Sequence, residues 1–387
     1  MFADCWHPVV NGVVTSIDIL RSRLVGLGHE VELYVPNAPG SNLPVLPGIH
    51  RFASFTVPIH KESCFSVPFP IRHVAHALRT RPDVVHLHTP FNLGILGVLT
   101  AWRWGVPYVF THHTLWEEYV HYVPLVSPRT SRRAAIALCR AYGNHAGAVI
   151  APSAEVQERF KQQGVTSPID VIPTGIDVEI FENGQPERVR AELDLSEDEP
   201  VAIYAGRMGK EKSLDFVLGA FRLVLKELPR ARLLMIGGGP EKEALEAIAA
   251  RLGIERRVVF TGYVPRTRLV DYFRAAHVFV FASTTETQGL VSLEAQAAGL
   301  PVVAVRASGS TEAVVDGETG FLVARDEEAF SAATVRMLRD VTLRDRMAAK
   351  ASAHAHACSS QSMAERALAV YESAIERCRR GVVRSTT

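Results

Sequence analysis

Two glutamates flank a glycine in the segment "STTETQGLVSLEAQAAGLPVVA", and their spacing suits the binding of hydroxyl groups. Glu286 and Glu294 have seven residues between them, and Gly289 stands at a predicted helix start. The second glutamate then lies about one turn into the helix, whereas the first comes from the preceding loop. Carboxylates placed in this way can accept hydrogen bonds from the vicinal hydroxyls of a ribose or a hexose. The alternative is an ordinary capped helix that carries two solvated glutamates.

The same helix start and a second segment offer positive charge to an anion. The backbone N–H groups of Gly289 and Leu290 have no partner within the helix, so they can donate to a phosphate or sugar oxygen. The segment "AGRMGKEKS" follows an apolar strand and opens another helix, with Arg207 and Lys212 at its mouth. Two cations beside a helix N-terminus can neutralise a diphosphate and stabilise it as a leaving group. Taken singly, either cation is also explained as solvated surface.

Two further patterns are weaker. Gly237, Gly238 and Gly239 stand at a strand-to-helix turn but lack the full dinucleotide fingerprint, so they indicate a tight turn. His86 and His88 share one face of a predicted strand and could begin a metal site. No third ligand cluster accompanies them and no D-x-D occurs, so the motifs call for neither a bound metal nor a tightly held cofactor.

Composition and length limit the classes of protein that this chain can be. Its 387 residues suit two domains, and its net charge of +1 gives no general attraction to nucleic acid. The five cysteines are scattered, which argues against a disulfide framework and suits a reducing cytoplasm. No apolar run is long enough to span a bilayer, and no signal-peptide pattern precedes the first polar residues.

Short β-branched runs alternate with helical patterns, which predicts an α/β protein with two Rossmann-like, doubly wound domains. We expect an N-terminal domain over 1–178, a C-terminal domain over 179–360, and a helix with a basic tail over 361–387 that packs back on the N-terminal domain. The segment "ENGQPERVRAELDLSEDEP" is interpreted as a linker. The opening "MFAD" is shorter than the buried strand that normally begins such a domain, so weaker packing is expected around the first loop. The predicted strands are "EVELYV", "DVVHLH", "PYVFTH", "GAVIAP", "VAIYAG", "RLLMIG", "RVVFTG", "HVFVFAS" and "PVVAV".

Together these motifs resemble the retaining glycosyltransferases of family 4, which have the GT-B fold of two domains facing across a cleft. The segments "PTGID" and "SGSTEAVVDGETGFLV" add to the resemblance, which covers nearly the whole chain. It implies that Arg207 and Lys212 bind the diphosphate of a nucleotide sugar, and that Glu294 binds the ribose. It also implies that Glu286 meets the donor sugar, and that the loop with Gly12 approaches the phosphates.

The family also places a histidine against the donor hexose, after the strand that "PYVFTHHT" resembles. His113 is the better match because Thr114 follows it as in the family's "HT" pair. Adjacent residues of a strand point to opposite sides, so only one of His112 and His113 can face the site. Without the resemblance, either is equally explained as a surface or packing histidine.

Within the family, "THHTLWEEYVHYVP" and "TETQGL" most resemble the diacylglycerol glucosyltransferases. Trp116 and Tyr119 offer apolar contact to an acceptor, and Glu117 or Glu118 could position its hydroxyl. A packed helix start with exposed glutamates explains these residues as well. The acid-free, arginine-bearing "SPRTSRRAAIALCRAYG" could lie on an anionic membrane, as could "SCFSVPFPIRHVAHALR" with Phe65, Phe69 and Ile71 beside Arg72 and Arg79. The alternative is a solvated helix and a core-covering loop.

The resulting prediction is retaining transfer of a hexose, glucose or galactose, from UDP-hexose to a diacylglycerol-type lipid. The enzyme would be cytoplasmic and peripheral on the inner face of the membrane. Alternatives within the family are a phosphatidylinositol, a soluble sugar or a polysaccharide as acceptor. Alternatives outside it are a sugar-nucleotide epimerase, a phosphorylase or an inactive nucleotide-sugar-binding module, which fold analogy alone does not separate.

Overall fold

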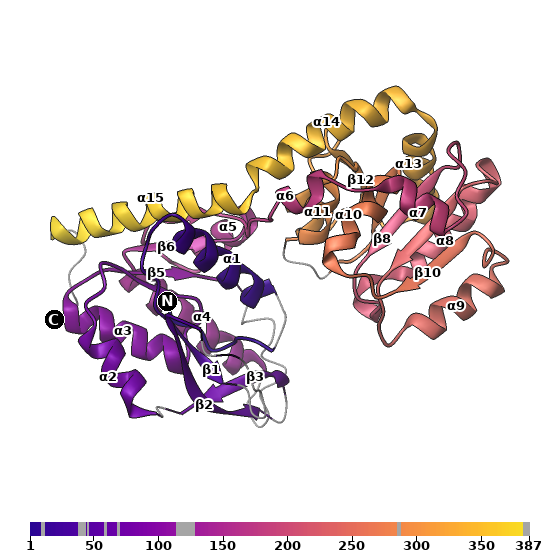
Figure 1. Ribbon diagram of the computed structural model, residues 1–387. Helices are drawn as coiled ribbons and strands as arrows, with labels where there is room; N and C mark the ends of the chain where they lie inside the picture. The colour runs from indigo at the N-terminus through magenta and orange to yellow at the C-terminus, as the bar shows by residue number, and fades with distance from the viewer. Residues whose placement is uncertain are drawn as a thin grey trace. The chain divides into compact units, whose positions relative to one another are not determined.

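The computed structural model describes residues 1–8, 12–37, 44, 46–57, 60–67, 70–113, 128–284 and 288–381. The chain forms two compact units, which Figure 1 colours along the sequence. The N-terminal unit comprises Met1–Gly175 together with Met363–Thr387, and the C-terminal unit comprises Ile176–Ser362. These breaks lie close to the boundaries expected at 178 and 360.

The C-terminal unit is built around one parallel sheet of six strands with the order β10-β9-β8-β11-β12-β13. In chain order this is 3-2-1-4-5-6, the arrangement of a doubly wound dinucleotide-binding domain. The strands are β8 (Val201–Ala205), β9 (Arg232–Ile236), β10 (Val258–Gly262), β11 (Val278–Phe281), β12 (Val302–Val305) and β13 (Gly320–Val323). β8, β11 and β12 are buried along their whole length, as expected for strands covered on both faces.

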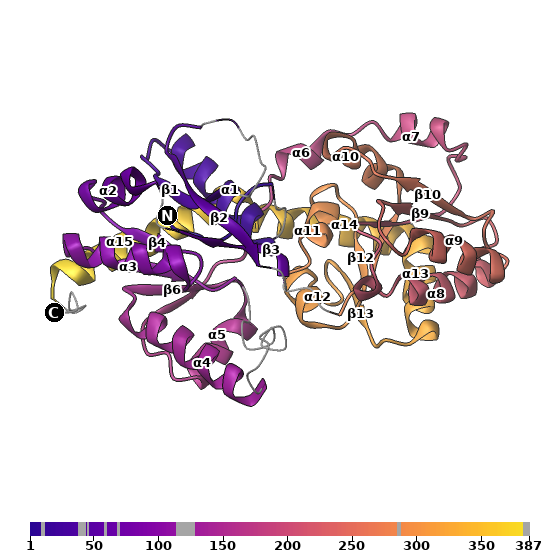
Figure 2. The same cartoon turned by 90° about the horizontal axis from the view of Figure 1, so that it is seen from below.

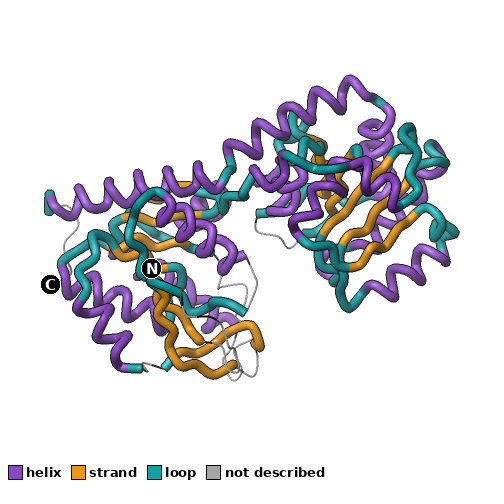
Figure 3. Tube along the Cα trace, in the orientation of Figure 1, coloured by secondary structure: helices purple, strands orange, loops and turns teal. Residues whose placement is uncertain are grey.

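Helices cover both faces of this sheet (Figure 3). They are α6 (Glu179–Glu182), α7 (Pro186–Glu192), α8 (Leu214–Glu227), α9 (Lys242–Arg251), α10 (Arg266–Ala275), α11 (Leu290–Ala297), α12 (Ser308–Ala313), α13 (Glu327–Arg339) and α14 (Val341–Ala357). α8 packs against α9 and α13 on one face, whereas α11 contacts α14 and α12 (Figure 2). Side-chain caps begin α13 and α14, where Asp326 and Asp340 accept from the N–H groups of Ala329 and Leu343.

The N-terminal unit combines two strand groups, β1-β2-β3 and β4-β5-β6-β7. Its strands are β1 (Leu33–Asn37), β2 (Ile49–Val57), β3 (His60–Ser66), β4 (Val85–Leu87), β5 (Tyr108–Thr111), β6 (Ala148–Ala151) and β7 (Ile169–Val171). Its helices are α1 (Gly12–Gly26), α2 (Ile71–Arg79), α3 (Asn92–Trp104), α4 (Pro128–His145), α5 (Ala154–Gln162) and most of α15 (Ser360–Arg379). All pairs are parallel except β2 with β3.

Phe2 joins the two strand groups of the N-terminal unit. It forms parallel bridges to Tyr34 of β1 and to Leu87 of β4, and it is 2% exposed. Its ring stacks on Tyr34 with the centroids 4.5 Å apart. The opening segment therefore contributes a bridge in place of a full strand, as its short apolar run predicts.

The last helix packs on the N-terminal unit. Met363, Ala367 and Tyr371 of α15 share a buried cluster with Leu20 of α1 and Val109 of β5. The apolar residues that repeat along the helix thus supply a face that packs on this unit.

All nine strands predicted above are present, but one interpretation is wrong. The segment taken as a linker contains α7, and its Val189 is fully buried in the core of the C-terminal unit. The segment "SCFSVPFPIRHVAHALR" contains the end of β3 and all of α2, so it belongs to the folded N-terminal unit, and its contact with an anionic membrane stays a prediction. Ile71, Arg72 and Arg79 of this segment are exposed, whereas Phe69 lies outside the described residues.

Candidate active site

The loops after β8 and β11 lie side by side at one edge of the C-terminal sheet. β8 and β11 are parallel neighbours, with Ala202 beside Val278 and Ile203 beside Phe279. Strand order reverses at this pair, and ligands of doubly wound domains bind at the carboxyl ends of the strands where such a reversal occurs. The Ser283 hydroxyl, after β11, donates to the Glu211 carbonyl, after β8, at 3.1 Å.

The two predicted cations lie in the first of these loops. Arg207 is exposed, and Lys212 ends a 3₁₀ turn (Lys210–Lys212) directly before α8. Ser213 follows with φ of 51°, a left-handed conformation that a residue with a side chain rarely adopts. Lys212 therefore stands beside the N-terminus of α8, and Arg207 lies earlier in the same loop. Cations near a helix N-terminus suit an anion such as a diphosphate.

Glycines allow the loops after β8 and β9 to interlock. The Gly206 N–H donates to Ile236, and the Met208 N–H donates to Gly238 at 2.8 Å. A Cβ on Gly237 would collide with the Gly206 carbonyl, and one on Gly239 with Met208. Gly237 and Gly239 thus serve backbone packing, as expected of a tight turn, whereas a Cβ on Gly238 would meet no atom within 4 Å.

The helix start at Gly289 is present as predicted. Gly289 caps α11 with φ of 59°, and Leu290 is the first helical residue. A Cβ on Gly289 would lie 2.9 Å from the Gly309 carbonyl, at the start of α12. The N-termini of α11 and α12 therefore approach each other closely, and the first N–H groups of each helix have no acceptor within that helix.

Glu294 lies in α11, about one turn from Gly289. Its side chain is 15% exposed, and the Arg266 guanidinium donates to its Oε1 at 2.7 Å. Burial raises the pKa of Glu294; nearby Arg266 opposes this shift, and Asp177 adds to it. The spacing that marked Glu294 gave no sign of Arg266, because the two residues come from different helices.

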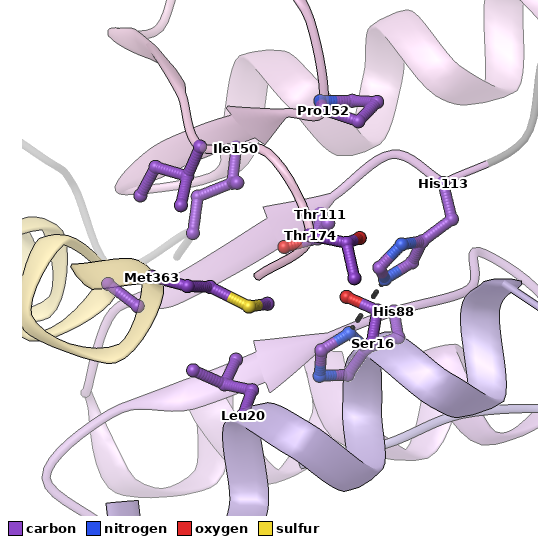
Figure 4. Close-up of a pocket in the computed structure, with 11 residues that line it drawn as sticks. Ser16, Leu20, His88, Thr111, His113, Ile150, Pro152, Thr174 and Met363 are labelled. Carbon is purple, nitrogen blue, oxygen red and sulfur yellow. Dashed lines mark hydrogen bonds between the residues drawn. The ribbon is translucent and has the colours of Figure 1, made fainter. Parts of the chain in front are cut away.

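A small pocket lies in the N-terminal unit, at the carboxyl ends of β4, β5 and β6 (Figure 4). It is lined by His88, Thr111, His113, Ile150, Pro152, Ile172 and Thr174, with Ser16 and Leu20 from α1 and Met363 and Ala367 from α15. His88 and His113 are neighbours in the wall of the pocket, and Nδ1 of His88 lies 3.0 Å from Nε2 of His113, within hydrogen-bond distance. Burial lowers the pKa of His113 to about 3, so this imidazole is neutral at physiological pH.

His112 points away from this pocket, as strand alternation predicts. It is 2% exposed, its ring lies 4.4 Å from that of Phe160, and neither ring nitrogen has a hydrogen-bond partner in the described part of the chain. Burial lowers its pKa to about 3 as well. Both nitrogens of His86 are engaged, one with the Tyr371 hydroxyl and one with the Thr111 hydroxyl, each at 2.6 Å.

Three groups of predicted site residues remain to be placed. Gly12 is the exposed first residue of α1, and a Cβ there would meet no protein atom within 4 Å. Internal packing therefore does not demand a glycine at this helix N-terminus. Glu286 lies outside the described residues, as do Trp116, Glu117, Glu118 and Tyr119.

Comparison with known protein families decides the class of this chain. Residues 10–180 match the model of Glycosyltransferase Family 4, and residues 185–354 match that of Glycosyl transferases group 1. An alpha-monoglucosyldiacylglycerol synthase of Acholeplasma laidlawii is 31% identical over 85% of this chain and 85% of its own length. The chain is a family 4 glycosyltransferase.

Other relatives of this glycosyltransferase carry two different names. An alpha-monoglucosyldiacylglycerol synthase of Streptococcus pneumoniae is 33% identical over 79% of this chain and 70% of its own length. A D-inositol 3-phosphate glycosyltransferase of Streptomyces scabiei is 35% identical over 97% of this chain and 89% of its own length.

Solved structures share the architecture of the family 4 glycosyltransferase. Anabaena HepE in complex with UDP has a TM-score of 0.75 at 20% identity, covering 95% of this chain and 98% of that one. WaaG, a glycosyltransferase involved in lipopolysaccharide biosynthesis, has a TM-score of 0.68 at 18% identity, covering 95% of this chain and 98% of that one. The predicted GT-B fold, two α/β domains with parallel sheets, is confirmed.

Proposed function

We propose that this glycosyltransferase moves a hexose, glucose or galactose, from UDP-hexose to a diacylglycerol-type lipid, with retention of anomeric configuration. One observation carries the proposal. The loop after β8, with Arg207 and Lys212, is hydrogen-bonded to the loop after β11, which leads to Gly289 and Glu294. Cations and free N–H groups suit a diphosphate, and a carboxylate one helical turn away suits a ribose. HepE, of the same fold, binds UDP.

Each residue at this edge has a defined role in the proposal. Arg207 and Lys212 neutralise the diphosphate, so a divalent ion is not required for this purpose. The N–H groups of Gly289 and Leu290 donate to a phosphate or sugar oxygen, while Glu294 accepts from the ribose hydroxyls and Glu286 meets the hexose. Gly12, which no neighbour within the protein requires, lets the backbone of the N-terminal unit approach a phosphate.

His113 and the segment after it supply the N-terminal contribution. A neutral imidazole can accept from or donate to a hexose hydroxyl without adding charge beside the diphosphate. Trp116 and Tyr119 would contact the acceptor, and Glu117 or Glu118 would orient its hydroxyl.

The reaction that these roles support is a same-face displacement. The bond between the anomeric carbon and the phosphate oxygen breaks, and the acceptor hydroxyl oxygen bonds to the same face of that carbon. The hydroxyl proton passes to the departing phosphate oxygen, and UDP leaves. The cations favour this step because negative charge grows on the diphosphate as the bond breaks.

The names of two relatives support the lipid acceptor, since both are alpha-monoglucosyldiacylglycerol synthases. D-Inositol 3-phosphate is a second candidate, because relatives with that name reach 35% identity over 97% of this chain. The two acceptors differ sharply in chemistry, since one is a membrane lipid and the other a soluble anion.

A lipid acceptor requires contact with a membrane, and we propose that the enzyme is cytoplasmic and peripheral on its inner face. Among the described residues, no helix combines the length and apolar character needed to cross a bilayer. α4 exposes Arg129, Arg132, Arg133 and Arg140 and lacks acidic residues. Such a helix is attracted to anionic lipid headgroups.

A donor and acceptor screen tests the proposal. UDP-glucose and UDP-galactose are each offered with dispersed diacylglycerol or D-inositol 3-phosphate, and product stereochemistry is read by NMR. We expect an α-linked hexose on diacylglycerol. Transfer to D-inositol 3-phosphate alone would select the second candidate. If neither acceptor received a hexose from UDP-glucose or UDP-galactose, both candidates would be contradicted.

A further inference from the structure

A second cluster of reactive side chains lies at the opposite edge of the N-terminal unit, away from its pocket. Glu32 immediately precedes β1, and His50 is the second residue of β2. Both therefore lie at the amino ends of parallel strands, whereas the pocket lies at carboxyl ends.

Strand register brings these side chains together. Glu32 and Tyr34 share a face of the chain because side chains alternate along a strand. Tyr34 pairs with His50 in register, and their rings stack at 4.7 Å. α2 then crosses this face and brings His73 and His76, which are neighbours on one helix side at three residues' spacing.

The groups are close enough to share one ion. One ligand atom each from Glu32, His50 and His76 lie within 4.8 Å of one another. The Glu32 carboxylate is 2.6 Å from Nε2 of His50, and the rings of His50 and His76 are 4.3 Å apart. Ligands of a tetrahedral zinc ion lie about 3.3 Å apart, given metal–ligand bonds of about 2.0 Å. Small side-chain adjustments therefore suffice to enclose an ion.

Neighbouring groups hold the ligands in position. The Tyr34 hydroxyl lies 2.9 Å from Nδ1 of His76, which leaves Nε2 of that ring available. Nδ1 of His73 is 3.3 Å from Nδ1 of His50, the ring nitrogen opposite the one that faces Glu32. Metal-binding histidines are typically oriented through their second nitrogen in this manner.

We propose that Glu32, His50 and His76 bind one divalent first-row transition ion of the zinc type. Two imidazoles and one carboxylate suit zinc better than magnesium or calcium, which prefer oxygen ligands alone. The ion would join β1, β2 and α2, and would take the place of the hydrogen bond between Glu32 and His50. Because its ligands lie at the opposite edge from the pocket, its role is to stabilise the N-terminal unit.

Zinc binding to the full-length, untagged protein tests this site, because a histidine tag would bind zinc itself. We expect equilibrium dialysis to find one tightly held zinc ion per chain. At saturating zinc the melting temperature should rise by about 5 °C or more relative to chelator-treated protein. Cobalt in place of zinc should give the visible absorption of a tetrahedral site.

Variants locate the ion. His50→Gln with His76→Gln should abolish both the bound zinc and the rise in melting temperature, while His145→Gln, an exposed histidine of α4, should retain both. Glu32→Gln, which leaves every histidine in place, should weaken zinc binding at least tenfold even if the double variant does not fold. No zinc bound to the wild type, or equal binding by Glu32→Gln, would overturn the proposal.

Discussion

The hydroxyl of Ser283 donates to the main-chain carbonyl of Glu211 at 3.1 Å, and this contact ties together the loops after β11 and β8. Ser283 is 1% exposed, so its hydrogen bond is shielded from water. The bond fixes the segment that ends in Lys212 against the segment that leads to Gly289. Residues 72 positions apart in the sequence thereby form one surface at the sheet edge where the strand order reverses.

Removal of the Lys212 ammonium should impair catalysis without unfolding the protein. Lys212→Ala removes charge that stabilises the departing diphosphate, so kcat should fall by about 100-fold or more. Lys210→Ala is the matched control, because this exposed lysine belongs to the same 3₁₀ turn. It should keep kcat within about threefold, the effect expected of a solvated charge. Steady-state kinetics measure kcat, and thermal melts show whether each variant is folded. Equal losses of kcat in Lys212→Ala and Lys210→Ala would contradict the role of Lys212.

Glu286→Gln should lower turnover far more than stability. The proposed contact with the donor hexose is lost, whereas the amide keeps the size of the carboxylate. We expect kcat to fall by about 100-fold, as for other groups that orient a reacting substrate, and the melting temperature to stay within about 2 °C. Turnover equal to that of the wild type would remove Glu286 from the site.

Glu294→Gln should weaken donor binding. A charged hydrogen bond contributes roughly 1.5–3 kcal/mol, so the KM for UDP-hexose should rise about tenfold or more. Burial raises the pKa of Glu294, and the ionised form accepts best. Donor affinity of the wild type should therefore fall on acidification, starting at a higher pH than for an ordinary glutamate.

The Gln variant should lack this acid-side loss, because it has no proton to gain. Glu243→Gln, an exposed position in the first turn of α9, serves as the control and should leave the KM unchanged. A pH profile that is the same in wild type and Glu294→Gln would show that another group causes the effect.

The sequence predicted the parts of the fold that local pattern determines. Buried strands such as Val201–Ala205 are continuous apolar runs, and Gly289 marks a helix start because a left-handed cap favours glycine. β2 was missed because "HRFASFTV" mixes charged and apolar residues, and α7 was mistaken for linker because its one fully buried residue, Val189, sits among charged neighbours.

The sequence also indicated Arg207, Lys212, Gly289 and Glu294 as candidate site residues, because each lies in or just after a strand-to-helix connection. It did not indicate contacts between distant segments. The pairing of Arg266 with Glu294, of His88 with His113, and the meeting of Glu32 with His76 each depend on strand order and register. A single sequence contains no local signal for such order.

His112→Phe should remove part of the acid sensitivity of the fold. The pKa of His112 falls from its ordinary 6.5 to about 3 on burial, so the unfolded chain binds a proton that the folded chain refuses. Stability is therefore fully present above pH 6.5 and is lost as the pH falls from there toward 3. Between pH 7 and 5.5 this amounts to about 1 kcal/mol for one histidine.

A phenylalanine suits the site because the His112 ring already packs on Phe160 and Phe110. Urea unfolding at the two pH values measures the effect, and the difference between them should shrink by about 1 kcal/mol in His112→Phe. His145→Gln, at an exposed position, should preserve the wild-type difference. An unchanged difference in His112→Phe would show that His112 is protonated in the folded protein.

Charge removal from α4 should release the enzyme from anionic membranes. Arg129, Arg132 and Arg133 are exposed in the first two turns of the helix, and each cation near an anionic surface contributes about 1 kcal/mol. The triple Gln variant should therefore lose about 100-fold in affinity for anionic vesicles in sedimentation assays. Wild-type binding should weaken as salt rises, because salt screens the attraction.

A second surface of the N-terminal unit separates charge from apolar insertion in the same assay. α3 exposes a row of apolar side chains, Ile95, Leu99 and Trp102, and Trp102 is the most exposed of the three at 59%. We expect Trp102→Ser to reduce vesicle binding without changing its salt dependence, because insertion of an apolar side chain among the headgroups does not depend on charge. Arg251→Gln, an exposed position in the last turn of α9, is the control and should bind as the wild type does.

Binding of the wild type to neutral and anionic vesicles alike, at every salt concentration, would contradict the role of the α4 arginines, because uncharged headgroups offer these cations no attraction.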